Sequence, residues 1–371
     1  MKDTPPPGEH ELIAGDNDAG SRLDKIVRRA LPDLGLSQLH RMLRVGQIRL
    51  NGKRCKPADR VHAGDRITVR QLPQHQARQP QADADSPPDA VSTASGEQHL
   101  EPASQVLIEG RILLENEHIL ALHKRRGTLV HGQNSLAEAV ARYLRSRITA
   151  SLSFRPGPLH RLDRNSSGVI LFGKSVHGAR RFSQLLRDHA VEKCYLALCA
   201  GDVASACRWS KPVSRDHRTH RSHVAESGRS GRDAATADAR RQERRHGSAM
   251  PAETVVQPLA RGRNRDGEPL TLILCTIRSG RTHQIRAHAA AHGVPLAGDA
   301  KYGGGKLLGG YILHAISVEL SQHDELLGFQ RIVDYPEESV LRRLQRFIGP
   351  DAQRAIDAVV QGRSKGLHSG T

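Results

Sequence analysis

The feature that most constrains the fold of this chain is a segment that cannot contribute to a hydrophobic core. Residues 71–105 contain five prolines and many Gln, Ala, Ser and Asp residues, but no aromatic residue. Such a composition buries too little apolar surface to offset the entropy of ordering, so we expect a flexible linker. It separates a small part, residues 20–70, from a large part, residues 106–330. Helices and a basic tail are expected over 331–371. Residues 1–19, rich in Pro, Gly and acidic residues, are predicted to be disordered.

The chain as a whole is strongly basic, and this charge indicates the class of its partner. It has 56 Lys and Arg residues against 39 Asp and Glu residues, a formal net charge of +17. An excess of this size calls for a polyanion, and nucleic acid is the first candidate. No apolar run approaches the roughly 18 residues of a membrane-spanning helix. The N-terminus lacks the apolar segment of a signal peptide. We therefore expect a nucleic acid as the partner, and no membrane.

Cysteine and histidine usage argues against a metal or disulfide scaffold. The five cysteines are scattered and form no C-x-x-C pair, which is typical of a reducing cytoplasm. His217, His220 and His223 are three residues apart, but no Cys or carboxylate completes a ligand set, so no metal site is expected. These histidines lie in a basic insert, about residues 203–250, which we expect to contact phosphates.

The small part has the pattern of an α+β unit. A helix carrying Leu23, Ile26 and Val27 is expected to stop at Pro32. A second helix is predicted between a Ser37 cap and Gly46. The Asn51-Gly52 pair is a hairpin signal, and a last strand runs through residues 66–69.

Charge on this unit predicts an RNA-binding surface. Residues 20–70 hold thirteen Lys or Arg residues and four Asp or Glu residues. Basic residues alternate with apolar ones on the two helices, a shape suited to RNA backbone. The candidate contacts are Arg22, Arg41, Arg44 and Lys53. Residues 20–25, 41–53 and 63–67 together resemble the RNA-binding module named after ribosomal small-subunit protein four.

In the large part, residues 160–168 have the sequence HRLDRNSSG, followed by the apolar run of residues 169–172. Asp163 stands between Arg161 and Arg164, before a polar turn and a predicted buried strand. Neighbouring positive charge keeps a carboxylate ionised, and a fixed, ionised carboxylate can serve as nucleophile or base. On these nine residues alone, an ordinary surface turn is the better interpretation.

A second informative stretch, residues 279–288, has the sequence SGRTHQIRAH. Thr282 is expected to cap a helix that ends at Gly293. A helix N-terminus near Arg281, His283 and Arg286 is suited to binding an anion. Packing is the expected role of the later histidines, 288 and 292. Further helices are predicted over 136–144 and 176–189, and strands over 193–198 and 270–277.

Three stretches in fixed order, residues 160–168, 193–198 and 280–286, resemble the RluA-type pseudouridine synthases, and residues 313–315 add a weaker match. The ribosomal RNA branch, the RluC-like enzymes of the large subunit, is most similar. The resemblance implies an α+β catalytic domain with a central mixed, largely antiparallel sheet flanked by helices, plus the small α+β N-terminal RNA-binding domain. It implies an isomerase without cofactor or metal, monomeric and with no obligatory protein partner, acting on ribosomal or transfer RNA.

The same resemblance implies roles for individual residues. The family breaks the bond between uracil and ribose, turns the base and rejoins it through carbon five. Asp163 would be the catalytic carboxylate, attacking the sugar or assisting a glycal route. Tyr195 would stack on the base, and Arg286 would pair with Asp163. Arg161 would fill the gap left by the flipped uridine. Leu313 would line the base pocket, with His160, Arg281 and His283 as further substrate contacts.

Two departures and two alternatives accompany this interpretation. The segment of residues 124–127, KRRG, lacks the proline usual in the family, and Ser166 replaces the usual Thr. A non-catalytic RNA-binding or ribosome-assembly protein would explain the charge but not the three stretches. An RNA N-glycosidase or nuclease could use the same carboxylate, and would release uracil or cleave strands instead of forming an isomer.

Overall fold

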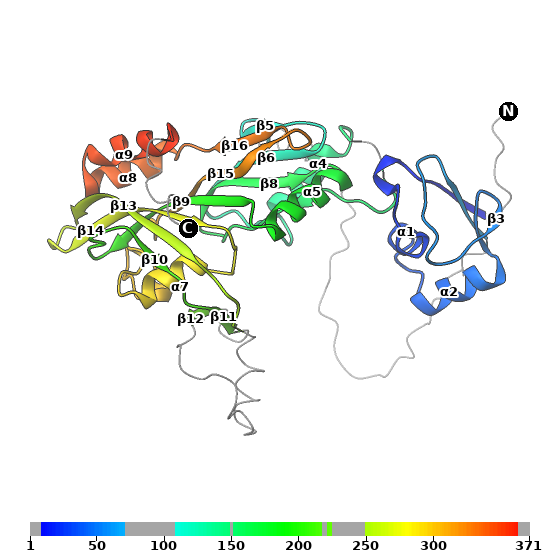
Figure 1. The fold of residues 1–371 in the computed structure, drawn as a ribbon, viewed down its shortest axis with the longest axis horizontal. Helices are drawn as coiled ribbons and strands as arrows, with labels where there is room; N and C mark the ends of the chain where they lie inside the picture. Colours follow the sequence, from blue (N-terminus) through cyan, green and yellow to red (C-terminus); the bar gives the residue numbers. More distant parts are fainter. Residues whose placement is uncertain (1–8, 71–107, 149–150, 217–220, 225–248, 363–371) are drawn as a thin grey trace, which may run out of the picture. The chain divides into compact units, whose positions relative to one another are not determined.

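The computed structural model describes residues 9–70, 108–148, 151–216, 221–224 and 249–362, and the chain forms two compact units (Figure 1). The first unit comprises residues 1–107 and 141–155, and the second comprises residues 108–140 and 156–371. The predicted linker, the basic tail and much of the basic insert lie outside the described residues. Residues 141–155 join the first unit although they follow the linker, which the sequence did not indicate.

The first unit is an α+β fold. Its sheet has the strand order β1-β4-β2-β3, and two helices complete a core that includes Ile67 and Val69. The elements are β1 (Glu9–Ile13), η1 (Asp16–Asp18), α1 (Leu23–Ala30), α2 (Leu36–Val45), β2 (Ile48–Leu50), β3 (Lys53–Arg54) and β4 (Arg66–Arg70). Asn51 and Gly52 both have positive φ and form the predicted hairpin turn between β2 and β3.

Two expectations for this unit were wrong. Residues 9–19 are ordered, because β1 pairs antiparallel with β4 and Ala14 is buried in the core. The pairing satisfies the backbone groups of both strands, which composition alone could not indicate. Helix α2 begins after Gly35, so Ser37 lies inside the helix and does not cap it. Gly46 closes the helix with φ +78°, as predicted.

The second unit is built on a ten-stranded mixed sheet with the main order β10-β13-β14-β9-β15-β8-β6-β5. Strand β16 pairs with β15, and β7 pairs with β8. Among the described strand pairs, only β8 and β15 run parallel, which confirms the predicted mixed, largely antiparallel sheet. The strands are β5 (Ile112–Glu115), β6 (Ile119–Lys124), β7 (Gly157–Pro158), β8 (Ser167–Gly173), β9 (Val191–Ala200), β10 (Cys207–Trp209), β13 (Thr254–Arg263), β14 (Pro269–Ile277), β15 (Leu313–Asp324) and β16 (Phe329–Val333). A separate hairpin consists of β11 (Val213–Asp216) and β12 (Arg221–Val224).

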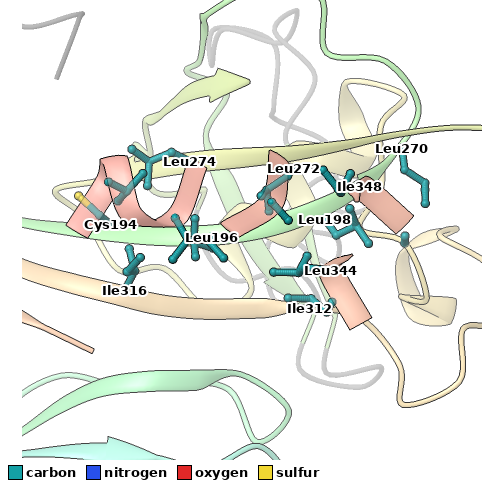
Figure 2. Close-up of a cluster of buried hydrophobic side chains, with 14 residues drawn as sticks. Cys194, Leu196, Leu198, Leu270, Leu272, Leu274, Ile312, Ile316, Leu344 and Ile348 are labelled. Carbon is teal, nitrogen blue, oxygen red and sulfur yellow. The ribbon is translucent and has the colours of Figure 1, made fainter. Parts of the chain in front are cut away.

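Helices α8 and α9 pack on one face of this sheet and determine which side chains face the other way. Leucines of β9 and β14, among them Leu196 and Leu198, form a core with Leu344 and Ile348 of α8 (Figure 2). Because successive side chains of a strand alternate, Tyr195 points to the opposite face. The helices are α4 (Leu136–Leu144), α5 (Val176–Arg187), α7 (Gln284–Ala291), α8 (Glu338–Ile348) and α9 (Asp351–Val360), with the short η2 (Ala300–Tyr302). None of the helices in the described ranges has the length and apolar character needed to cross a membrane.

Candidate active site

The parallel contact between β8 and β15 brings residues 160–168 to the middle of the sheet. Ser167 pairs with His314, and Gly168 pairs with Ala315. Gly168 has φ +113°, and a Cβ atom at this position would lie 2.3 Å from the carbonyl oxygen of Ala315. Only glycine permits both this backbone conformation and this approach. The loop that carries Asp163 is therefore held against the start of β15.

The ammonium group of a buried lysine holds the backbone of this loop in place. The Lys124 Nζ donates to the carbonyl oxygens of Asp163 at 3.1 Å and Ser166 at 2.6 Å. It also donates to the carbonyl of Arg164 at 3.1 Å. Burial lowers the pKa of Lys124 to about 8. The Ser166 N–H donates to the Asp163 carbonyl at 3.1 Å and closes the predicted polar turn.

The guanidinium next to the Asp163 carboxylate comes from α7 and not from the neighbours of Asp163 in sequence. The Arg286 Nη1 lies 3.3 Å from Asp163 Oδ2. Arg164 instead donates through Nε to the carbonyl of Gly127 at 3.1 Å, and Arg161 is exposed. The expectation that Arg161 and Arg164 supply the guanidinium beside the carboxylate was wrong, because both side chains are exposed and Arg164 is hydrogen-bonded to Gly127. The sequence-predicted approach of Arg286 to Asp163 is present.

Arg286 is held on all sides by residues that the sequence did not single out. Its Nε and Nη2 donate to the two carboxylate oxygens of Asp299 at 2.7 and 2.9 Å. The rings of Tyr302 and Tyr311 lie 4.8 and 4.6 Å from its guanidinium carbon. Burial disfavours its charge, but the ion pair with Asp299 outweighs burial and raises the pKa of Arg286. The sequence offered one sign of these contacts. An Asp and a Tyr lie in a short segment bounded by glycines, residues 298–303, and polar residues in such segments often belong to functional sites.

The start of α7 differs from the prediction. The helix begins at Gln284, and its N-cap is His283, with φ +54°, so Thr282 is not the cap. The Gln284 side chain accepts hydrogen bonds from the Ser279 hydroxyl and the Arg281 N–H, at 2.8 and 3.1 Å, which holds the turn before the helix. The His283 Nε2 lies 3.8 Å from Asp163 Oδ2.

The two later histidines pack as expected. His288 is fully buried, with Nδ1 2.9 Å from the Thr254 hydroxyl and Nε2 2.8 Å from the Lys211 carbonyl. His292 stacks on Trp209. Within the described residues, no group of three His, Cys, Asp or Glu side chains could hold a metal ion.

An open pocket lies over Asp163, and Tyr195 and Leu313 form its apolar side. Tyr195 is 6% exposed. Burial, together with the nearby charge of Asp163, raises the pKa of Tyr195, so the phenol is neutral at pH 7. Seven sequence-predicted residues line this one pocket: Asp163, Tyr195, Arg286, Arg161, Leu313, Arg281 and His283.

His160, predicted as a substrate contact, is not among the residues that line the pocket. Its Nε2 accepts a hydrogen bond from the Leu171 N–H at 3.1 Å, and its ring lies 6.2 Å from that of Phe182. Burial lowers the pKa of His160 to about 3. His160 therefore fixes the segment that leads into the catalytic loop, because its hydrogen bond and ring contact are both made inside the fold.

The predicted RNA-contact residues of the first unit are accessible. Arg22 precedes α1, Arg41 and Arg44 lie on α2, and Lys53 lies in β3, and all four are exposed. Arg22 pairs with Asp24 at 2.6 Å. Helix α2 and the β2–β3 hairpin therefore present basic side chains to solvent.

Known proteins resemble this chain over most of its length. Residues 118–291 match the family model described as RNA pseudouridylate synthase, and residues 21–67 match the S4 domain. The ribosomal large subunit pseudouridine synthase C of Salmonella typhimurium is 31% identical, over 82% of this chain and 82% of that protein. Its namesake from Escherichia coli K12 is 30% identical, over 93% and 98%. A solved structure of human RNA pseudouridylate synthase domain containing 4 has the same fold, with a TM-score of 0.51 and 21% identity over 66% of this chain and 96% of that one. The chain belongs to the RNA pseudouridylate synthase family.

Proposed function

We propose that this enzyme isomerises specific uridines of large-subunit ribosomal RNA to pseudouridine. The substrate class is supported by the relatives named above, each similar over most of the chain. The exposed basic residues of the S4-type module, residues 20–70, support a division of labour. This module would supply much of the affinity for RNA phosphates, and the domain of residues 106–330 would supply the chemistry.

In the proposed mechanism, Asp163 is the catalytic carboxylate. The bond between C1′ and N1 breaks, the uracil turns within the pocket, and a bond forms between C1′ and C5. The C5 proton is lost and N1 gains a proton, so substrate and product are isomers. A carboxylate beside the reacting sugar stabilises positive charge that develops there, as in glycosidases. Asp163 acts either by attacking the sugar or by assisting a glycal route.

The other pocket residues receive the base and the RNA. Arg286 pairs with the Asp163 carboxylate and holds it in position. Tyr195 stacks on the uracil, and Leu313 lines the base pocket. Arg161, exposed at the pocket, fills the space left when the uridine leaves its stack, since the reacting atoms are inaccessible in paired RNA. Arg281 and His283 also line the pocket, and Arg281 contacts the sugar-phosphate backbone.

We further propose that the enzyme works as a monomer in the cytoplasm. The five cysteines carry free thiols, three of them buried, which suits a reducing compartment. Size-exclusion chromatography with light scattering would test the oligomeric state, and a dimer at micromolar concentration would contradict it.

The observation that carries the proposal is the carboxylate of Asp163 in a pocket shared with Tyr195 and Arg286. The test is a pseudouridine map of ribosomal and transfer RNA from cells carrying the wild-type protein or Asp163→Asn. Loss of defined large-subunit sites in the variant is the expected result. An unchanged map in both RNA classes would favour a binding-only protein. Released uracil or cleaved strands would favour an N-glycosidase or nuclease.

A further inference from the structure

Besides Arg286, a series of three residues linked by successive polar contacts leads to the Asp163 carboxylate. The Ser222 N–H, on β12, donates to the Tyr302 hydroxyl at 2.9 Å. The Tyr302 hydroxyl lies 2.9 Å from His283 Nδ1. The His283 Nε2 faces Asp163 Oδ2 at 3.8 Å. We propose that Tyr302 and His283 form a directed hydrogen-bond chain from the β11–β12 hairpin to Asp163, in which both side chains are positioning residues for that carboxylate.

The direction of the chain follows from the state of the imidazole. Burial lowers the pKa of His283 to about 4, and the positive charges of Arg286 and Lys301 oppose protonation further, against the attraction of Asp163 and Asp299. A neutral imidazole carries a single N–H. If Nε2 carried a lone pair, that lone pair would repel the negative carboxylate oxygen of Asp163. The single proton of the imidazole is therefore on Nε2. Nδ1 is then the acceptor, and the Tyr302 O–H is its donor.

Tyr302 is suited to this role. The Arg286 guanidinium carbon lies 4.8 Å from the centre of its ring, and the positive charge over the ring strengthens its hydroxyl as a donor. The Ser222 N–H already donates to the same oxygen, which polarises the O–H group further. The ring of Tyr302 and the ring of His283 meet edge to face, with centroids 5.7 Å apart. Tyr302 therefore orients both partners of Asp163, Arg286 through its face and His283 through its hydroxyl.

The backbone of His283 provides a second indication. Its φ of +54° lies in the left-handed region, which is costly for a residue with a Cβ. Such strain persists where surrounding contacts maintain it, and often at functional sites. Here the strained residue directs Nε2 toward the carboxylate. The 3.8 Å separation exceeds a hydrogen bond, and bonds of this kind commonly shorten when substrate is bound.

This hydrogen-bond chain also gives the basic insert a role inside the site. Strand β12 lies beside α7 (Figure 1). The Ser222 N–H donates to Tyr302, and its own buried hydroxyl has no hydrogen-bond partner among the residues that the structure describes. The β11–β12 hairpin thus contributes a backbone N–H donor to the Tyr302 hydroxyl. The catalytic carboxylate depends on a segment that the sequence suggested only for phosphate contacts.

This inference rests on the proposed role of Asp163, and matched variants test it. Tyr302→Phe keeps the ring over Arg286 and removes only the hydroxyl. His283→Asn tolerates the left-handed backbone and reaches Tyr302 but not Asp163, whereas His283→Gln carries a donor amide at the position of Nε2. Ser222→Pro removes the backbone donor, and Ser222→Ala keeps it. Each variant is assayed on large-subunit ribosomal RNA transcribed in vitro, with thermal unfolding as the check on folding.

We expect Tyr302→Phe, His283→Asn and Ser222→Pro to lower kcat about tenfold, the effect of one hydrogen bond near a charged group, with KM within about twofold. His283→Gln keeps a donor toward Asp163 but loses the bond from Tyr302, so it should lose less kcat than His283→Asn, and Ser222→Ala should retain the wild-type kcat. Tyr302→Phe combined with His283→Asn should be no slower than either alone, because the groups act as one unit. Two outcomes would overturn the inference, provided that Asp163→Asn is inactive. One is a wild-type kcat in Tyr302→Phe, and the other is an equal loss of kcat in His283→Asn and His283→Gln. An active Asp163→Asn enzyme would instead overturn the proposed function.

Discussion

Arg286 gives two hydrogen bonds to Asp299 and turns its remaining nitrogen toward Asp163, so one guanidinium joins a structural carboxylate to the candidate catalytic one. The two carboxylates differ in exposure. The side chain of Asp299 is 2% exposed and that of Asp163 is 16% exposed. A buried, bidentate pair is rigid, and the direction of the third nitrogen is therefore set by Asp299.

This arrangement predicts that stability and turnover can be separated. Arg286→Ala should abolish turnover and destabilise the fold by about 3–5 kcal/mol, because Asp299 is left buried without its partner. Adding Asp299→Asn removes that buried charge and should recover part of the stability but none of the activity. Urea unfolding and pseudouridine formation would be measured on both variants. Recovery of turnover in the double variant would show that Arg286 does not act on Asp163.

Lys124 predicts opposite trends of activity and stability above pH 8. The pKa of Lys124 is lowered by burial to about 8, below the ordinary value of about 10.4 that it has in the unfolded chain. Between about pH 8 and about 10.4, Lys124 is therefore protonated in the unfolded chain and mostly neutral in the folded one. The unfolded chain binds more protons in this range, so the contribution of Lys124 to the free energy of unfolding rises with pH. Activity should fall over the same range, because the neutral amine has fewer N–H groups for the carbonyls of the Asp163 loop.

The measurement for Lys124 is a pair of pH profiles, kcat and thermal midpoint, on the wild-type enzyme and Lys124→Met. The variant should have a much lower kcat without the fall above pH 8, since it lacks the titrating donor. A variant that keeps both full kcat and the alkaline decline would contradict the proposed role of this lysine.

The candidate site could be predicted from sequence only where its residues lie in short, recognisable stretches. Asp163, Tyr195 and Arg286 do so, and the pocket brings them together. Their supports could not be predicted, because each acts through a contact made by the fold. Lys124 reaches the carbonyls of residues about 40 positions later, and Asp299 and Tyr302 lie in a short segment without a distinctive pattern. Which guanidinium approaches Asp163 depends on the direction of α7, and not on adjacency in sequence.

The fold shows the same division. The apolar runs of residues 169–172 and 194–198 correctly predicted buried strands, because burial on both faces requires continuous apolar residues. Strand β1 was missed, since its order depends on pairing with β4, about 55 residues later. Residues 141–155 belong to the first unit for a similar reason. Leu152 packs against that unit's core, and Arg29 donates to the Ser153 carbonyl.

Arg161 offers a test of base flipping. If its side chain fills the space that the uridine leaves, Arg161→Ala should slow the reaction most where flipping is costly. We expect about a hundredfold loss of kcat/KM when the target uridine is in a stem, from a flipping cost of a few kcal/mol. The loss should be smaller when the same uridine is in an unpaired loop. Two transcripts that differ only in the opposing strand would be compared, with Arg164→Ala as the control. Equal losses on both transcripts would indicate a simple phosphate contact.

Asp18 predicts an acid-sensitive first unit. Its carboxylate accepts hydrogen bonds from Leu152, Ser151, Gly15 and Ser153. Burial alone would raise the pKa of Asp18, but these hydrogen bonds outweigh it and the pKa is lowered. A carboxyl with a lowered folded pKa contributes stability above its unfolded pKa, near 3.9, and that stability is lost as pH falls through the folded value.

Asp18→Asn should therefore destabilise the first unit by about 2–3 kcal/mol at pH 7, and the difference from wild type should shrink below about pH 3. Asp16→Asn, an exposed position two residues away, is the control and should remain within about 0.5 kcal/mol of wild type. Unfolding would be followed by urea titration at pH 7 and pH 3. A difference that stays constant with pH would contradict the ionic role of Asp18.

The exposed basic residues of α2 and β3 predict how the module holds RNA. Deleting the module would uncover Leu152, which packs against its core, so charge substitution is the cleaner test. Arg41, Arg44 and Lys53 changed together to Gln should weaken binding and reduce the slope of log Kd against log salt by about one for each lost phosphate contact. The kcat should be unchanged, because these residues are not part of the pocket.

The matched control for that triple variant removes the same charge from α8 and α9, at the exposed positions Arg342, Arg346 and Arg354. Net charge alone would weaken binding equally in both triple variants, whereas a defined RNA surface would weaken it only in the module variant. Filter binding of in vitro transcribed ribosomal RNA from 50 to 300 mM salt would separate the two. Equal slopes in both variants would mean that the bound RNA is held by the overall charge of the protein, and not by α2 and the β2–β3 hairpin.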